Sequence, residues 1–256
     1  MIHPTAIVHP GAEIAEGVEI GPYVIIGAHV RIGRGTTVGP HTVIDGWTEI
    51  GEDNRIFNMA SVGGIPQDLK YRGEETWLRI GNRNVIREFT TLQPGTVTGI
   101  GETVIGDDNL FMAYCHVAHD CVIGNRVIMA NGSTLAGHVV VEDFAILGGL
   151  SAVHQFVRVG ESAMLSGGAM VVQDVLPFTI ASGNRAVSSG LNTVGLRRRG
   201  FSEELVGRIK KAYRLVIRSG LKLEEALRRI REEIPPSQEV DHFVTFAEKS
   251  ERGLCR

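Results

Sequence analysis

The sequence lacks a long hydrophobic run. No stretch of its 256 residues reaches the ~18 uninterrupted apolar residues that a membrane-spanning helix needs. The first residues, Met1-Ile2-His3-Pro4, are not a basic segment followed by an apolar one, as a secretion signal would be. We therefore expect a soluble, cytoplasmic protein without stable membrane insertion.

The sequence also contains few cysteines and has a small net charge. The three cysteines, Cys115, Cys121 and Cys255, form no regularly spaced even set, which argues against a disulfide framework. A net charge of −3 argues against a general nucleic-acid binder. Residues 197–231 nevertheless hold twelve Lys or Arg against four acidic residues. This asymmetry predicts an acidic partner, and the alternative is a solvated basic helix face.

Aliphatic residues recur at every sixth position through most of the chain. The row contains Ile2, Val8, Ile14, Ile20, Ile26, Ile32, Val38, Ile44, Ile50, Ile56 and Val62, resumes at Ile80, Ile86 and Leu92, and runs again from Ile105 to Val171. Six is an even number, so these side chains share one face of an extended backbone, whereas a helix would scatter them. Glycine often follows the aliphatic residue and permits a turn. The pattern predicts a mainly β protein built as a parallel β-helix.

The repeat is interrupted twice and then ends. The six-residue step would place Asp68 and Glu74 in the apolar interior, so residues 63–79 are expected to form a projecting loop. Residues 94–103 are expected to form a second, shorter loop. After Val171 the repeat stops, and helices are expected after a Ser202 N-cap, over residues 223–234 and over residues 240–250. We predict a β-helix over residues 1–190 and a small α-helical domain over residues 191–256.

The densest polar cluster in the repeat lies around Val117. His116 and His119 flank this buried position, and Asp120 follows His119. A neutral imidazole suits a general base near pH 7, and a neighbouring carboxylate can hold its tautomer. His138 and His154 follow at spacings close to one coil of eighteen residues, which predicts a vertical stripe on the prism. The alternative is a set of ordinary surface histidines.

Several motifs together carry a family resemblance. They are His116-Val117-Ala118-His119-Asp120, Leu135-Ala136-Gly137-His138, Ala152-Val153-His154-Gln155-Phe156, Pro66-Gln67-Asp68-Leu69-Lys70-Tyr71, and Asn192 with Arg197-Arg198-Arg199-Gly200-Phe201. With them the chain resembles, over essentially its whole length, the UDP-N-acetylglucosamine O-acyltransferases that use acyl carrier protein. The resemblance implies a left-handed β-helix, a homotrimer with active sites between subunits, and the first step of lipid A biosynthesis.

The resemblance also implies the catalytic roles. His119 would take the proton from the 3-hydroxyl of the sugar, and Asp120 would orient His119. The backbone N–H of Gly137 would stabilise the oxyanion of the tetrahedral intermediate. The 3-hydroxyacyl donor would arrive on the phosphopantetheine of acyl carrier protein, docked by the basic helices. No metal and no separate cofactor are expected.

The remaining site residues follow from the same resemblance. The substrate-binding set would comprise Gln67, Asp68, Lys70, His116, His138, His154, Gln155, Asn192, Arg198 and Arg199. Within it, Asp68 would contact the sugar, Lys70 would meet the diphosphate, and Asn192 and Arg198 would hold the uridine-phosphate end of the UDP-amino-sugar. Gly167 would act as the acyl-length ruler, and its missing side chain predicts a long acyl chain. The alternative is a plain turn glycine.

Two departures from the family pattern leave the acceptor open. The family often has His-Arg-Gly-Thr where this chain has Gln93-Pro94-Gly95-Thr96, and Glu where it has Val194. An acceptor with a 3-amino group, which gives an amide product, is therefore the main alternative.

Three rival functions are less well supported. A zinc enzyme like the gamma-class carbonic anhydrases would recruit His116, His119 and His138, with Cys115 and Cys121 as further candidates. The related N-acyltransferases normally carry an extra N-terminal domain, for which a repeat starting at Ile2 leaves no room. A non-catalytic scaffold would not explain the histidine stripe.

Overall fold

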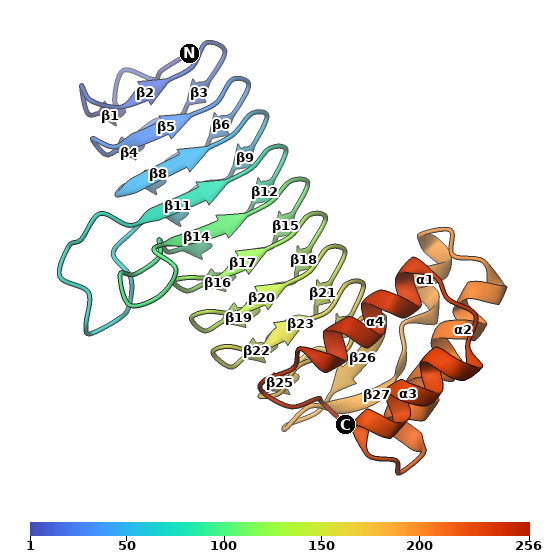
Figure 1. Cartoon of the computed structure of the whole chain (residues 1–256). Helices are drawn as coiled ribbons and strands as arrows, with labels where there is room; N and C mark the ends of the chain where they lie inside the picture. Colours follow the sequence, from blue (N-terminus) through green and yellow to red (C-terminus); the bar gives the residue numbers. More distant parts are fainter.

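The chain folds into a prism of stacked coils followed by a group of helices (Figure 1). We describe it from a computed structural model that covers residues 1–256. Each coil gives one short strand to each of three sheets, and the strands within the prism pair in parallel. Neighbouring coils stack in register, with Val8 beside Ile26 and Ile26 beside Ile44. The prism is therefore a parallel β-helix, as the six-residue repeat predicts.

The three sheets run the length of the prism. The first sheet contains β1 (Ile7–Val8), β4 (Ile25–Ile26), β7 (Val43–Ile44), β10 (Ser61–Val62), β13 (Thr91–Leu92), β16 (His116–Val117), β19 (Thr134–Leu135), β22 (Ala152–Val153) and β25 (Met170–Val171). The second sheet contains β2 (Glu13–Ile14), β5 (Val30–Ile32), β8 (Trp47–Ile50), β11 (Trp77–Ile80), β14 (Glu102–Ile105), β17 (Val122–Ile123), β20 (Val140–Val141) and β23 (Arg158–Val159). The third sheet contains β3 (Glu19–Ile20), β6 (Thr37–Val38), β9 (Arg55–Ile56), β12 (Val85–Ile86), β15 (Leu110–Phe111), β18 (Ile128–Met129), β21 (Ile146–Leu147), β24 (Met164–Leu165), β26 (Thr179–Ser182) and β27 (Val187–Leu191).

The repeated aliphatic residues fill the interior of the prism. The last residue of almost every strand points inward, and 40 buried residues form one continuous core. Ile44, Val62 and Leu92 are completely buried, whereas Ile2 in the first coil is half exposed. Burying a side chain of this size contributes about 1.5–3 kcal/mol, so the stacked ladder holds the coils together. The predicted periodicity thus corresponds to the packing.

Both interruptions of the repeat leave the prism at the same edge, where the first sheet turns into the second. One loop joins β10 to β11 and the other joins β13 to β14 (Figure 1). The first loop covers residues 63–76 and is shorter than the predicted 63–79. The difference arises because Trp77–Ile80 pairs with Trp47–Ile50, with Leu78 buried in the prism. The strand thus begins before the first residue at which the six-residue step resumes.

The helices follow an antiparallel turn at the end of the prism. They are α1 (Thr193–Arg198), α2 (Glu203–Tyr213), a π-helical turn η1 (Arg214–Arg218), α3 (Leu223–Glu233) and α4 (Gln238–Glu248). Ser202 caps α2 through the N–H of Leu205, as expected, while Ser237 caps α4 through the N–H of Val240. The predicted division at residue 190 falls inside β27, because β27 still pairs with β26. No helix is long and apolar enough to cross a membrane.

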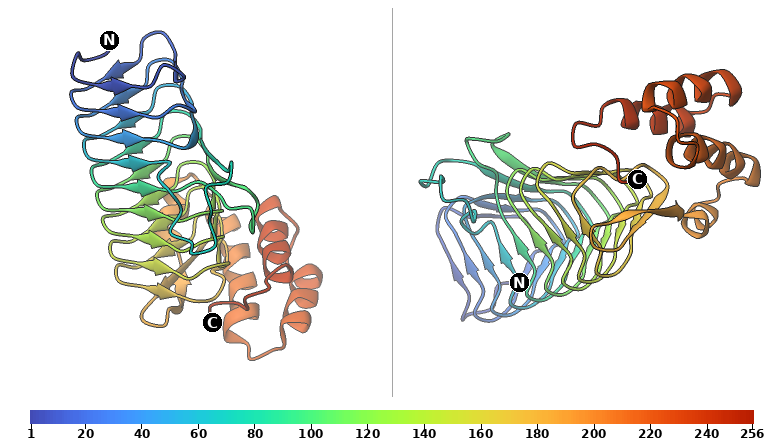
Figure 2. Two further views of the ribbon diagram at one scale, coloured as in Figure 1. Left: turned by 90° about the vertical axis from the view of Figure 1, so that its left-hand side faces the viewer. Right: turned by 90° about the horizontal axis from the view of Figure 1, so that it is seen from below.

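The helical part has its own core and docks on the end of the prism. Eighteen buried residues, Phe178, Phe243 and Phe246 among them, form this second core. Helix α4 lies beside the prism (Figures 1 and 2) and is fixed by a 2.7 Å hydrogen bond between His242 Nε2 and a Glu142 carboxylate oxygen. Arg158 also stacks over Phe246 at 4.2 Å. Polar and apolar contacts therefore set the position of the helices together.

Candidate active site

Two of the predicted histidines, His119 and His138, meet at one edge of the prism. We call this edge the histidine corner: the turns at residues 118–121, 136–139 and 154–157, which join the first sheet to the second. The ring of His138 stacks on Phe156 with centroids 4.4 Å apart and meets the edge of the His119 ring at 5.1 Å. Asp120, His138 and Phe156 occupy the same turn position, each with φ near +60°. The stacking of coils thus places Asp120, His138 and Phe156 in one column, whereas His116 is aligned with Thr134 and Ala152, so the predicted column of His116, His138 and His154 does not form.

The second loop holds the Asp120 carboxylate in a cage of donors. Oδ1 accepts hydrogen bonds from the backbone N–H groups of Thr96, Ile100 and Gly101 at 2.9–3.2 Å. Oδ2 accepts one from the Thr96 hydroxyl at 2.7 Å and lies 2.8 Å from His119 Nδ1. Burial raises the pKa of the Asp120 carboxyl, but the hydrogen bonds from Thr96 and His119 outweigh burial, and the net pKa is lowered. Asp120 is therefore a fixed anion.

This geometry determines which nitrogen of His119 is available. A carboxylate can only accept, so the Nδ1 of His119 donates to Asp120 and its Nε2 is left without a proton in the neutral ring. Nε2 has no hydrogen-bond partner within the chain. The residue motifs pointed to Asp120 but not to the loop that holds it. The cage donors are backbone groups, and no side-chain pattern could have revealed them.

Gly137 lies directly against the His119 ring. A Cβ atom at this position would approach His119 Cε1 to 2.6 Å and Nε2 to 2.8 Å, so only glycine leaves the ring in place. The N–H of Gly137 is buried and donates to no acceptor in the chain. A buried N–H without a partner is costly in a folded protein. This donor is therefore free to bind a ligand oxygen next to the imidazole.

Two further histidines flank the pair. His116 Nδ1 lies 2.6 Å from the Thr91 hydroxyl, and burial together with the charge of His119 lowers its pKa. Burial also lowers the pKa of His138, against the opposing effect of the Asp120 charge. Both rings are therefore neutral near pH 7. His154 is exposed, with its Nδ1 3.2 Å from an Arg252 nitrogen.

The first loop brings the predicted acceptor residues towards the same corner. Asp68 lies in the loop that leaves the prism at this edge, and its negative charge opposes the lowering of the pKa of His138 by burial. Lys70 is exposed, and its N–H donates to Asp68 Oδ1 at 2.9 Å. Gln67 is exposed beside Asp68, and Gln155 is exposed in the turn at residues 154–157. The predicted acceptor residues therefore lie on a loop and a turn at this edge of the prism, with Gln67, Lys70 and Gln155 exposed.

Three predicted residues lie away from the corner in this chain. Asn192, Arg198 and Arg199 follow β27 of the third sheet, which forms the side of the prism opposite the histidine corner. Asn192 is buried, caps α1 through Gly195 N–H and donates to the Ser162 carbonyl. Arg199 pairs with a Glu161 oxygen at 2.6 Å, whereas Arg198 is exposed without a partner. A single chain therefore does not bring them to His119.

Gly167 is exposed at another edge of the prism, where the third sheet turns into the first. A Cβ added there would meet only the Gly149 carbonyl oxygen, at an ordinary contact distance of 3.4 Å. Its φ is not left-handed, in contrast to that of Gly168. A Cβ is thus accommodated at this position without strain.

The two cysteines considered as zinc ligands lie in the interior of the prism. Cys115 and Cys121 are completely buried in the prism, and burial raises the pKa of Cys121 to about 12. Donor atoms of His119, Asp120 and His138 lie within 4.8 Å of one another. The lone pairs of Asp120 are, however, already engaged by the loop donors and by His119. The chemistry of this donor set therefore suits a hydrogen-bonded pair better than a metal.

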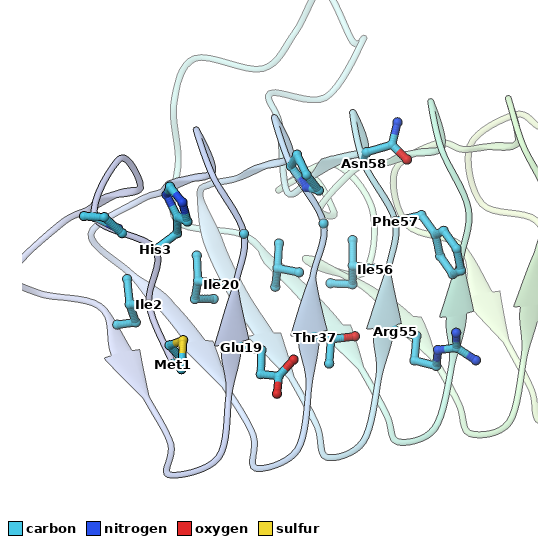
Figure 3. A pocket seen from close by; sticks show the side chains of 15 residues that line it. Met1, Ile2, His3, Glu19, Ile20, Thr37, Arg55, Ile56, Phe57 and Asn58 are labelled. Atoms are coloured by element: carbon cyan, nitrogen blue, oxygen red, sulfur yellow. The ribbon is translucent and has the colours of Figure 1, made fainter.

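The hollow in Figure 3 is distant from this corner. It has a volume of about 500 Å³ and lies on the outer face of the third sheet, at the first coils of the prism. Residues around it include Met1, Phe57, Glu19 and Arg55. It contains no pair of a base and an orienting acid. The histidine corner is the better candidate for catalysis.

The fold and the paired His119 and Asp120 define a class, the hexapeptide-repeat transferases. A family model described as bacterial transferase hexapeptide (six repeats) matches residues 1–34 and 102–137, and one described as UDP N-acetylglucosamine O-acyltransferase, domain 2, matches residues 174–255. The acyl-carrier-protein–UDP-N-acetylglucosamine O-acyltransferase of Burkholderia orbicola is 55% identical over 211 residues, covering 81% of this chain and 80% of the relative. That of Myxococcus xanthus is 57% identical and covers 82% of each chain.

Solved structures agree with these relatives. LpxA from Acinetobacter baumannii superposes with a TM-score of 0.97 at 46% identity, covering 100% of this chain and 99% of that one. The UDP-N-acetylglucosamine acyltransferase of Francisella novicida gives 0.96 at 40% identity, covering 100% and 94%. The chain belongs to the family of UDP-N-acetylglucosamine O-acyltransferases. The predicted family, the enzyme class and the left-handed β-helix are thereby confirmed.

Proposed function

We propose that this protein transfers a 3-hydroxyacyl chain from acyl carrier protein to the 3-hydroxyl of UDP-N-acetylglucosamine, the first step of lipid A biosynthesis. The observation that carries the proposal is the arrangement of His119, Asp120 and Gly137, in which a free imidazole nitrogen lies beside a free N–H. Ester formation from a thioester needs both a base and an oxyanion donor.

The reaction follows from this geometry. His119 Nε2 takes the proton of the sugar 3-hydroxyl as its oxygen attacks the thioester carbonyl carbon. Asp120 stabilises the resulting imidazolium, and the Gly137 N–H donates to the oxyanion. When the intermediate collapses, the C–S bond breaks and the imidazolium returns its proton to the phosphopantetheine sulfur. No metal or separate cofactor takes part in these steps.

The residues around the corner would bind the acceptor. Asp68 would accept a hydrogen bond from the sugar, and the exposed ammonium of Lys70 would meet the diphosphate. Gln67 and Gln155 would add amide contacts. The neutral rings of His116 and His138 and the exposed ring of His154 would line the cleft and form hydrogen bonds. An acyl chain that passes Gly167 would find no side chain in its way.

A homotrimer would complete the site. Exposed apolar side chains cover the first sheet and its edge with the third sheet: Ile7, Ile25, Val43, Tyr23, Met59, Phe89, Tyr114 and Leu150. The second sheet instead carries an ion-pair ladder of Glu13, Arg31, Glu49, Arg79 and Glu102. An apolar strip along one side of a prism favours packing against copies of the same chain. A neighbour would then supply Asn192, Arg198 and Arg199 to the histidine corner.

The carrier protein would dock on the basic helices. Lys210, Lys211, Arg214 and Arg218 are exposed and have no acidic partner within the chain, so they are available to an acidic protein surface. Other arginines in this region are already paired, such as Arg228 with Glu225 and Glu232. We propose that the reaction takes place in the cytoplasm, where the carrier and the sugar nucleotide are both soluble.

The test is a transfer assay with purified protein and a 3-hydroxyacyl carrier protein. UDP-N-acetylglucosamine and its 3-amino analogue are offered in separate reactions. We expect an alkali-labile ester on the first acceptor. Transfer to the analogue alone would contradict the assigned acceptor, and transfer to neither by folded protein would contradict the assigned reaction.

A further inference from the structure

Beyond Gly63, whose N–H still donates to the Leu92 carbonyl, residues 64–76 of the first loop are hydrogen-bonded to the prism through one side chain. Gln93 Oε1 accepts a hydrogen bond from the Gln67 N–H at 3.2 Å, and Gln93 Nε2 donates to the Ile65 carbonyl at 3.4 Å. These two bonds hold the backbone on both sides of Pro66. No other hydrogen bond connects residues 64–76 to the rest of the chain.

The other hydrogen bonds of the loop remain inside it. The Tyr71 hydroxyl donates to the Glu74 carbonyl, the Arg72 guanidinium donates to the Leu69 carbonyl, and Asp68 holds the N–H groups of Lys70 and Tyr71. These bonds fix Asp68 and Lys70 relative to each other. They do not fix either residue relative to His119.

Gln93 itself is firmly placed beside the catalytic coil. Its side chain is only 6% exposed, so both amide atoms need partners, and both find them in the loop. Its N–H donates to the Val117 carbonyl at 3.1 Å, two residues before His119. One residue thus connects β16, the strand that precedes the turn with His119, to the loop that carries Asp68.

We propose that Gln93 is a positioning residue that holds the acceptor loop over the histidine corner. The inference rests on the proposed function, because it assigns the loop to the sugar nucleotide. Without the tether, the loop would sample other positions, and the bound sugar nucleotide would have to restrain it. Binding of the acceptor would weaken, whereas the reaction of a bound acceptor would keep its rate.

The test replaces Gln93 with a residue of similar length that cannot hydrogen-bond, Gln93→Met. Losing two neutral hydrogen bonds corresponds to a rise of roughly tenfold in KM for the sugar nucleotide. We expect kcat at saturating acceptor and KM for the acyl carrier protein to stay within about twofold of the wild type. Gln93→Glu keeps an acceptor for the Gln67 N–H but sets a carboxylate oxygen against the Ile65 carbonyl, so it should raise KM as well.

Hydrogen exchange of the loop provides a readout that does not depend on activity. Peptides covering residues 64–76 should exchange faster in Gln93→Met than in the wild type. The matched control is Thr42→Val, which removes a buried hydrogen bond from the same prism, to the Phe57 carbonyl at 2.8 Å, without touching the loop. It should change neither KM nor loop exchange.

The outcomes separate the tether from the proposed function. A wild-type enzyme that does not acylate the sugar nucleotide would contradict the function, while the exchange data would still report on the tether. Unchanged hydrogen exchange of residues 64–76 in Gln93→Met would show that Gln93 does not hold the loop. Faster exchange with an unchanged KM would overturn the positioning role.

Discussion

An alanine at position 137 would press its methyl group against the imidazole of His119. The added Cβ would lie 2.6 Å from His119 Cε1, and an ordinary contact begins at 3.4 Å, so the ring would have to retreat by about 0.8 Å. The backbone tolerates the change, because Gly137 does not have a left-handed φ. The substitution therefore displaces the base and leaves the N–H of residue 137 in place.

The magnitude follows from the geometry of the pair. A retreat of this size would stretch or tilt the 2.8 Å contact between His119 Nδ1 and Asp120 and move Nε2 away from the attacking hydroxyl. Misplacing a catalytic group by about 1 Å costs roughly 10²-fold in rate. We expect kcat of Gly137→Ala to fall about 10²-fold, with the free energy of unfolding changed by less than about 2 kcal/mol.

The assay compares kcat with thermal unfolding for Gly137→Ala and Gly190→Ala. A Cβ added at Gly190 meets nothing within 4 Å, so this control should retain wild-type kcat. A Gly137→Ala enzyme with wild-type kcat would refute the reasoning, because His119 would then tolerate displacement. A large loss of stability would instead show that the ring cannot move.

Three further predictions test the base, the ruler and the domain contact. His119→Ala should lower kcat roughly 10³-fold or more without altering the unfolding temperature by more than a few degrees; ordinary turnover would exclude His119 as the base. Gly167→Met should shorten the preferred acyl chain, and an unchanged chain-length profile would remove Gly167 from the ruler role. The hydrogen bond from His242 to Glu142 raises the pKa of His242, so its stabilising effect is fully present below about pH 6.5 and is lost as pH rises through the raised pKa. His242→Gln should therefore lower Tm most near pH 6 and least near pH 9. Equal decreases in Tm at the two pH values would contradict the predicted pH dependence.

The prism could be predicted from the sequence because its core repeats. Every sixth side chain points inward, so Ile20, Ile44 and Val62 are buried for the same geometric reason. The exact loop ends could not be predicted, since Trp77 and Leu78 enter a strand before the repeat resumes. Helix α1 was also missed, because its six residues are too short for a periodic pattern and its cap, Asn192, resembled a ligand-binding residue.

The candidate site was only partly predictable. His119 and His138 could be found together because the turns of successive coils stack, which brings residues of neighbouring coils into contact. The cage around Asp120 could not, because three of its donors are backbone N–H groups that only folding of residues 96–101 brings together. The contacts of Gln93 depend in the same way on where the first loop folds back.

The final coil of the prism is covered by irregular chain, which pairs with it only at isolated bridges, and by one antiparallel strand. Val175 bridges to Val159, Asn184 bridges to Met170, and β27 runs antiparallel to β26. A stack of parallel strands that ended bare would offer its free N–H and C=O groups to the next molecule, as a growing fibre does. This cover stops the stack at one length. The protein thereby gains the rigidity of a fibril-like architecture while this end stays closed to further growth.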